Sequence, residues 1–204
     1  MSIPVVADAD TLFPATTRGL LIYLDYHGLV KLHWSALILD EVSRALVDTG
    51  RKKTLKDART HEARMCDALP NALVPMSNVR AQFESVAHAV RSAKDTHVAA
   101  CAPYLIVAKA YPDTSTVALV SRNTKDFKKI ELAKLGIVLQ KPDAFLAELC
   151  LMCPRELAAA FRHFRLDLTS QPDPEVLLLR LEQDGRLKTA QQLRHWHPIG
   201  KVEL

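Results

Sequence analysis

The sequence predicts an α/β fold built on a mostly parallel central sheet. Short apolar segments alternate with helical patterns from residue 3 to about residue 140. Strands that alternate with helices in this way form parallel sheets with helices on both faces, which gives a three-layer α/β/α arrangement. The segments that read as strands are residues 3–8, 29–34, 116–121 and 137–139.

The pattern changes to purely helical after Pro154. Helical spacing of apolar residues extends over 155–166, 174–185 and 187–196, and prolines separate the first two of these segments. We therefore expect one α/β domain over residues 1–150 and a helical C-terminal extension over residues 151–204.

Most expected helices start or stop at residues that favour such positions. Thr16 or Thr17 can cap a helix that ends near Gly28, and Ser35 can cap the next one. A polar helix over 54–69 ends before Pro70, whereas residues 79–90 are ambiguous. A further helix is expected at 96–102, and Pro103 directly after it predicts a kink or a break. Two more helices are expected, at 130–135 before Gly136 and at 143–152 after Pro142.

Composition excludes several classes of protein. Of the 204 residues, 49% are hydrophobic and 25% are charged, which is typical of a folded globular domain rather than a disordered or fibrous chain. No apolar segment reaches the roughly 20 residues that span a bilayer, and no signal peptide is recognisable, so a cytoplasmic location is expected. The four cysteines do not suggest a disulfide scaffold, and Cys150 and Cys153 are expected to be buried thiols.

The net charge of +4 is unevenly distributed along the chain. Residues 141–204 hold nine basic and nine acidic residues, so residues 1–140 carry the whole excess. Two basic clusters stand out, at 51–64 and at 122–134. Such clusters are either solvated helix faces or surfaces that bind a phosphate backbone.

Acidic residues recur where strands end and helices begin. Asp8 and Asp10 follow the first strand, Glu41 lies in the helix after the second, Asp95 opens a helix, and Asp126 follows a later strand. In a parallel sheet these positions share one edge, where sites form. Carboxylates gathered there repel each other, and a divalent cation relieves the repulsion. Oxygen ligands favour Mg²⁺ or Mn²⁺, which can activate water for phosphodiester cleavage.

Four segments of the chain resemble motifs of one family. They are Val5–Pro14, Ile38–Val42, Lys94–Ala100 and Val120–Phe127. In that order they are similar to the opening "hydrophobic-Asp-x-Asn" strand, the helix with the second acid, the "Asp-x-His-hydrophobic-x-Ala" helix and the "Thr/Ser-x-Asn-x-x-Asp-Phe" turn of the PIN-domain family. The resemblance covers about residues 3–140 and is closest to the VapC-type toxin ribonucleases of toxin–antitoxin pairs.

The resemblance implies a set of catalytic, metal-binding carboxylates and polar residues beside them. The catalytic and metal-binding residues are Asp8, Glu41, Asp95 and Asp126. Ser121 and Asn123 are expected at the rim of the site, and His97 is expected to make a hydrogen bond from a helix face. Asp10 stands where the family often has Asn, and is expected either to add a ligand or to raise the pKa of Asp8.

The resemblance also implies an activity and partners. We expect a Mg²⁺- or Mn²⁺-dependent endoribonuclease that acts as a toxin and leaves 5′-phosphate and 3′-hydroxyl ends. The partners that the resemblance implies are RNA, a cognate antitoxin and a second copy of the chain in a homodimer, with no membrane association. RNA contacts are expected from Arg51, Lys52, Lys53, Arg122, Lys125 and Lys128. The alternative is a catalytically weak PIN-like module that binds RNA or protein. A Rossmann-like nucleotide site is disfavoured because no glycine-rich phosphate loop follows a strand.

Overall fold

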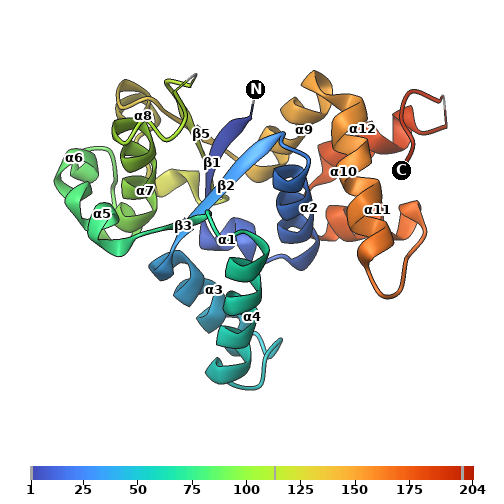
Figure 1. The fold of residues 1–204 in the computed structure, drawn as a ribbon, viewed down its shortest axis with the longest axis horizontal. Helices are drawn as coiled ribbons and strands as arrows, with labels where there is room; N and C mark the ends of the chain where they lie inside the picture. The colour runs from blue at the N-terminus through green and yellow to red at the C-terminus, as the bar shows by residue number, and fades with distance from the viewer. Residues whose placement is uncertain (1, 113, 199) are drawn as a thin grey trace. The chain divides into compact units, whose positions relative to one another are not determined.

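The protein is an α/β molecule with a parallel five-stranded sheet, as the sequence predicts, and it is consistent with a three-layer α/β/α arrangement (Figure 1). A computed structural model describes residues 2–112, 114–198 and 200–204. The strand order in the sheet is β3-β2-β1-β4-β5. The strands are β1 (Ile3–Ala7), β2 (Val30–Ser35), β3 (Leu73–Val74), β4 (Val117–Val120) and β5 (Ile137–Gln140).

Helices connect and follow these strands. The helices in the first part of the chain are α1 (Ala9–Leu12), α2 (Ala15–Tyr26), α3 (Ala36–Asp48), α4 (Leu55–Ala68), α5 (Met76–Ala81), α6 (Phe83–Ala87) and α7 (Thr96–Val107). Those in the second part are α8 (Lys129–Lys134), α9 (Pro142–Met152), α10 (Pro154–Asp167), α11 (Pro174–Gln183) and α12 (Leu187–Trp196). Within the described residues, no helix has both the length and the apolar character needed to cross a bilayer.

The chain forms two compact units, which are discontinuous in sequence. The sheet unit comprises Ile3–Phe13 and Lys31–Gln140. The tail unit comprises Ser2, Pro14–Val30 and Lys141–Leu204, so α2 groups with the helices that follow the sheet. The predicted boundary between residues 150 and 151 stays a prediction.

At the centre of the sheet, β1 pairs with β4, although the two strands lie far apart in sequence. Val5 and Val6 of β1 are fully buried, and their partners in β4 are Ala118 and Leu119. The last residue of β1, Ala7, pairs with the last residue of β4, Val120. Because the two strands are parallel, the residues that follow them emerge side by side at the carboxyl edge of the sheet.

The expected strands and helices are present, with differences at Pro103 and at the start of α2. Helix α2 begins at Ala15, before the two threonines that were expected to cap it, and no side chain caps it. The break that was expected as one of two outcomes does not occur, because α7 continues from Thr96 to Val107 with Pro103 inside it. Proline cannot donate a backbone hydrogen bond to the preceding turn. The residues from His97 to Pro103 are all buried, so packing of this helix offsets the missing bond. The ambiguous segment 79–90 contains the end of α5 and the short helix α6.

The tail unit is held together by hydrogen bonds between its sequence-distant parts. Asp184, after α11, accepts hydrogen bonds from the backbone N–H of Thr17 at 2.8 Å and from its hydroxyl at 3.0 Å. The buried Arg186 donates to the same hydroxyl at 3.1 Å. Asp143 at the start of α9 accepts hydrogen bonds from the backbone and side chain of Thr189 in α12. These bonds join the segment between α11 and α12 to α2, and the start of α12 to the start of α9.

Candidate acidic active site

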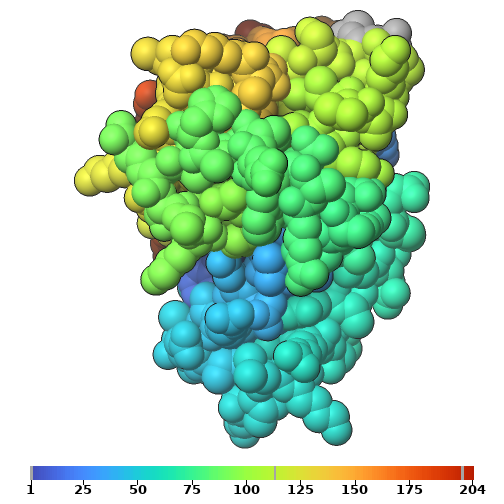
Figure 2. Space-filling model, turned by 90° about the vertical axis from the view of Figure 1, so that its left-hand side faces the viewer, coloured from blue at the N-terminus to red at the C-terminus, as the bar shows by residue number. Residues whose placement is uncertain are grey.

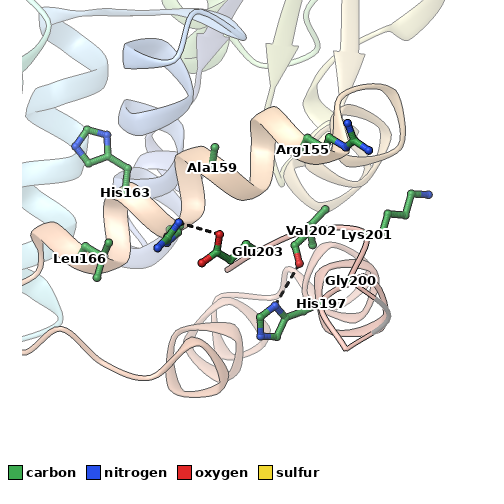
Figure 3. A pocket seen from close by; sticks show the side chains of 10 residues that line it. Arg155, Ala159, His163, Leu166, His197, Gly200, Lys201, Val202 and Glu203 are labelled. Atoms are coloured by element: carbon green, nitrogen blue, oxygen red, sulfur yellow. Dashed lines mark hydrogen bonds and ion pairs between the residues drawn. The ribbon is translucent and has the colours of Figure 1, made fainter.

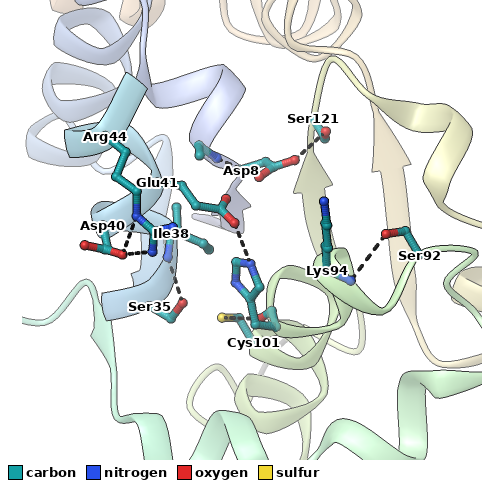
Figure 4. A network of polar contacts seen from close by, with 12 residues as sticks. Asp8, Ser35, Ile38, Asp40, Glu41, Arg44, Ser92, Lys94, Cys101 and Ser121 are labelled. Carbon is teal, nitrogen blue, oxygen red and sulfur yellow. Dashed lines mark hydrogen bonds and ion pairs between the residues drawn. The ribbon is translucent and has the colours of Figure 1, made fainter. Parts of the chain in front are cut away.

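Asp8 follows the carboxyl end of β1 and is held by hydrogen bonds of its backbone and its side chain. Its backbone N–H donates to Val120 O at 3.0 Å, which extends the pairing of β1 with β4. Its side chain accepts from Ala9 N at 2.6 Å and caps α1, and it accepts from the Ser121 hydroxyl at 2.6 Å (Figure 4). Only 6% of Asp8 is exposed. The carboxylate therefore has a fixed orientation in a buried position.

The surroundings of Asp8 disfavour its ionised form. The pKa of Asp8 is raised from 3.8 to about 7. Burial is the largest cause, and the charges of Asp10 and Glu41 act in the same direction, whereas the hydrogen bonds from Ser121 and Ala9 lower the pKa. The effect of Asp10 has the direction that the sequence predicts. A buried carboxyl with two acidic neighbours is a place where a bound cation is electrostatically favourable.

Asp10 organises the turn that follows β4. Its Oδ1 accepts a hydrogen bond from Arg122 N at 3.0 Å, and its Oδ2 accepts one from Asn123 N at 2.9 Å. The hydroxyl of Ser121 lies 3.4 Å from the same Oδ2. Asp10 thus binds the backbone of the turn that carries Ser121 and Asn123, which is a positioning role that the sequence did not indicate.

Glu41 reaches the site from α3, which begins at Ser35. The Ser35 hydroxyl caps this helix by accepting a hydrogen bond from Ile38 N at 3.3 Å. Glu41 Oε1 lies 3.1 Å from His97 Nε2 of α7, whereas the neighbouring Asp40 pairs with Arg44 on its own helix (Figure 4). Of these two adjacent acids, Glu41 is therefore the one whose charge acts on Asp8.

His97 makes the hydrogen bond that the sequence predicts for it. Only 7% of the residue is exposed, whereas the side chain of Glu41 is 42% exposed. A buried imidazole therefore holds a carboxylate that remains accessible to solvent. His97 orients Glu41 at a fixed position between α3 and α7.

Backbone pairing brings Asp126 and Asp95 to the same part of the sheet unit. Arg91 N donates to Asp126 O at 2.7 Å, and Lys128 N donates to Ala89 O at 2.8 Å. The segment before Asp95 thus runs beside the segment that contains Asp126. The amide of Asn123 donates a short hydrogen bond to Asp126 Oδ2.

Asp95 is electrostatically linked to the other acids. Partial burial raises its pKa, and the charges of Asp126 and Glu41 raise it further, while a Ser92 hydrogen bond and His97 lower it. Since Glu41 also raises the pKa of Asp8, the acids form a continuous series of interacting charges. We call Asp8, Asp10, Glu41, Asp95 and Asp126 the acid site.

The donor chemistry of the acid site fits Mg²⁺ or Mn²⁺. Its ligands are carboxylate oxygens, which these hard cations prefer. In the described parts of the chain, no group of three or more His, Cys, Asp or Glu side chains is placed to hold one ion together. Mg²⁺ commonly binds through one or two carboxylates, retains several waters and adds substrate phosphates. Asp8 and Glu41 are the residues that would hold it.

The basic residues expected to contact RNA are mostly exposed. Arg122 and Lys125 lie in the turn that Asp10 organises, and both are exposed. Lys128 is also exposed, and its Nζ donates to His88 O at 2.9 Å. Figure 2 shows one face of the sheet unit, with α3 and α4 in blue to teal below the green α5, α6 and α7.

Arg51 makes a contact that sequence reasoning missed. Its guanidinium lies 4.4 Å from the centre of the Phe13 ring, at the end of α1. This cation–π contact ties the first residue of the basic cluster at 51–64 to the helix that follows Asp8. Lys52 is half-buried and Lys53 is exposed. The sequence feature that could have indicated this contact is the aromatic residue Phe13, five positions after Asp8.

A groove in the tail unit contains none of the acid-site residues. It has a volume of about 710 Å³ and lies between one face of α10 and residues 200–203 (Figure 3). Arg162 and Glu203 form an ion pair of 3.0 Å within it, and His197 Nδ1 lies 3.3 Å from Val202 O. Its charged groups are partly paired with each other, so this groove is not the candidate site.

Comparison of the chain with models of protein families, with curated proteins and with solved structures finds no match.

Proposed function

We propose that this chain is a Mg²⁺- or Mn²⁺-dependent endoribonuclease of the PIN type. The observation that carries the proposal is the gathering of Asp8, Glu41, Asp95 and Asp126 from four separate segments into one series of interacting carboxylates. Concentrated negative charge of this kind destabilises a fold unless it binds a cation or serves another function.

The bound cation would supply activation of a water molecule and stabilisation of charge on the scissile phosphate. The protein's own groups then have distinct roles. Ser121 orients the Asp8 carboxylate and His97 orients that of Glu41. Asn123 orients Asp126 by a hydrogen bond to its carboxylate. Asp8 and Glu41 are thus each held by a side chain of another segment, and Asp126 is held from within its own turn.

Exposed cations support RNA as the substrate. Arg122 and Lys125 belong to the same turn as Asn123 and Asp126, so a phosphate backbone bound by them would lie beside the carboxylates. Arg51 packs against Phe13 at the end of α1, so it places a cation beside the segment that follows Asp8. Lys52, Lys53 and Lys128 extend the proposed RNA-binding surface.

A role as the toxin of a toxin–antitoxin pair is part of the proposal and rests on the resemblance of the four motifs. The cytoplasm is the proposed location. A cognate antitoxin is the proposed protein partner, and a homodimer is the proposed assembly. Induced expression of the chain in a bacterial host tests the toxin role, because a toxin arrests growth and an Asp126→Asn variant does not.

The enzymatic part is tested by incubating the purified chain with an unstructured RNA pool in Mg²⁺, Mn²⁺ or a chelator. We expect cleavage only with metal, and its loss in Asp126→Asn. Asp48→Asn is the matched control because Asp48 is an exposed residue at the end of α3. Metal-independent cleavage, or equal cleavage by Asp126→Asn, would contradict the proposal. RNA binding without any cleavage would favour the catalytically weak binding module.

A further inference from the structure

The tail unit carries a second cluster of polar side chains, separate from the acid site. Tyr23 and His27 lie one turn apart at the end of α2, and His163 and Asp167 lie one turn apart at the end of α10. The four side chains contact each other across the two helices. They belong to one unit, and the proposed nuclease chemistry uses none of them.

Contacts with Asp167 and Tyr23 orient the His163 ring. The Tyr23 hydroxyl donates to Asp167 Oδ2 at 2.6 Å, and burial and this carboxylate raise the pKa of Tyr23, which keeps the hydroxyl protonated. The same Oδ2 lies 3.4 Å from His163 Nε2. The Tyr23 ring packs edge-on against the His163 ring, with centroids 5.0 Å apart. A carboxylate that faces Nε2 favours the tautomer with its proton on Nε2.

The other nitrogen of His163 faces a second histidine. In that tautomer Nδ1 carries a lone pair, and it lies 3.2 Å from His27 Nε2. His27 either donates a proton to this lone pair or, as its other neutral tautomer, presents a lone pair of its own. In the second case two lone pairs face each other, and a cation between them is required. Burial and His163 both lower the pKa of His27, which favours its neutral form.

We infer that His27 and His163 form a binding site for a transition-metal ion such as Zn²⁺, with His27 Nε2 and His163 Nδ1 as its two protein ligands. Two nitrogens at about 2.1 Å from a tetrahedral Zn²⁺ lie about 3.4 Å apart, close to the 3.2 Å separation of these atoms. Water completes the coordination. The inference is independent of the proposed nuclease function.

Asp167 completes the chemistry expected around such a ligand. Metal-binding histidines commonly donate their second N–H to a carboxylate, which fixes the ring and increases its basicity. Asp167 is placed to accept that bond from His163, and Tyr23 fixes Asp167 in turn. Both histidines are exposed, so an ion can reach them from solvent. Imidazole nitrogen suits Zn²⁺, Ni²⁺ and Cu²⁺ rather than the Mg²⁺ expected at the acid site.

The way in which α2 ends fixes the position of His27 as a metal ligand. His27 is the C-cap residue directly after α2, and Gly28 follows with φ of +72°, a left-handed conformation that terminates helices. The ring therefore projects from a fixed helix end. An ion bound by His27 and His163 would link α2 to α10 and stabilise the tail unit.

Calorimetric titration of the full chain with Zn²⁺, in excess Mg²⁺, tests the site. We expect binding of Zn²⁺ by the wild type and affinity at least about tenfold weaker in both His27→Asn and His163→Asn. His195→Asn is the matched control, since His195 is an exposed histidine of α12 in the same unit. Asp167→Asn leaves both ligands in place, and we expect about a tenfold loss of affinity.

Circular dichroism of each variant confirms that the helices persist, so that lost binding reports the missing ligand. Loss in both histidine variants with retention in the control supports the site, even if the chain shows no nuclease activity. Equal affinity in all proteins, loss in only one of the two histidine variants, or no Zn²⁺ binding by the wild type would overturn it.

Discussion

Replacing Asp8 by Asn removes a charge that the metal-free fold tolerates poorly. The pKa of Asp8 is raised from 3.8 to about 7, and each unit corresponds to about 1.4 kcal/mol, so ionisation of Asp8 costs the folded state about 4 kcal/mol. A neutral Asn avoids this cost. Its oxygen can accept from Ala9 N, and its amide can donate to the Ser121 hydroxyl, which then turns its proton toward Asp10.

The sign of the pH dependence follows from the direction of the shift. Between pH 4 and about pH 7 the unfolded chain has lost the Asp8 proton while the folded chain retains it. The contribution of this proton to stability is complete below about pH 4 and is lost as the pH rises to about 7. Asp8→Asn should therefore match the wild type near pH 4 and exceed it by up to about 4 kcal/mol at pH 8.

Urea unfolding followed by circular dichroism, with a chelator present, measures this difference. Asp48→Asn should change the free energy of unfolding by less than about 0.5 kcal/mol at either pH, as exposed sites usually do. Added Mg²⁺ should stabilise the wild type and leave Asp8→Asn unchanged. If Asp8→Asn is no more stable than the wild type at pH 8, the reasoning about buried negative charge is refuted.

Other substitutions test separate contacts. His97→Ala should weaken Mn²⁺ binding by about 10- to 100-fold because Glu41 loses its orienting partner, while His97→Gln should retain more affinity; equal calorimetric affinities would contradict this role. Gly19→Ala should lower the free energy of unfolding by about 1–3 kcal/mol, because the added Cβ would clash with the ring of Phe164. An unchanged midpoint of urea unfolding would contradict that packing. Lys125→Glu should weaken RNA binding and reduce its salt dependence in filter-binding assays, and an unaltered salt slope would exclude a phosphate contact.

The elements that sequence reasoning predicted well are those with strong local signals. β1 and β4 are buried apolar segments, and Ser35 caps α3 as its position indicates. The helix does not break at Pro103, although a proline favours a break locally, because a helix that is buried along most of its length can contain a proline. The two-residue strand β3 has no periodicity to detect.

The roles of the site residues could be predicted from local sequence only in part. The motif indicated Glu41 rather than Asp40 as the site residue. In the structure this choice depends on the contact between α3 and α7, where His97 holds Glu41, whose charge acts on Asp8. The backbone role of Asp10 depended on the β1–β4 register, which places it beside the turn after β4. The grouping of α2 with the C-terminal helices arises from long-range contacts such as Thr17 with Asp184, which no local pattern encodes.

The central claim is that the acid site directs metal-activated water to cleave RNA. Analysis of the ends of the products made by the wild-type chain in Mg²⁺ tests this claim most directly. Attack by water predicts a 5′-phosphate on one product and a 3′-hydroxyl on the other, and no product in Asp8→Asn. A 2′,3′-cyclic phosphate, which arises when the ribose 2′-hydroxyl attacks instead, would contradict the account.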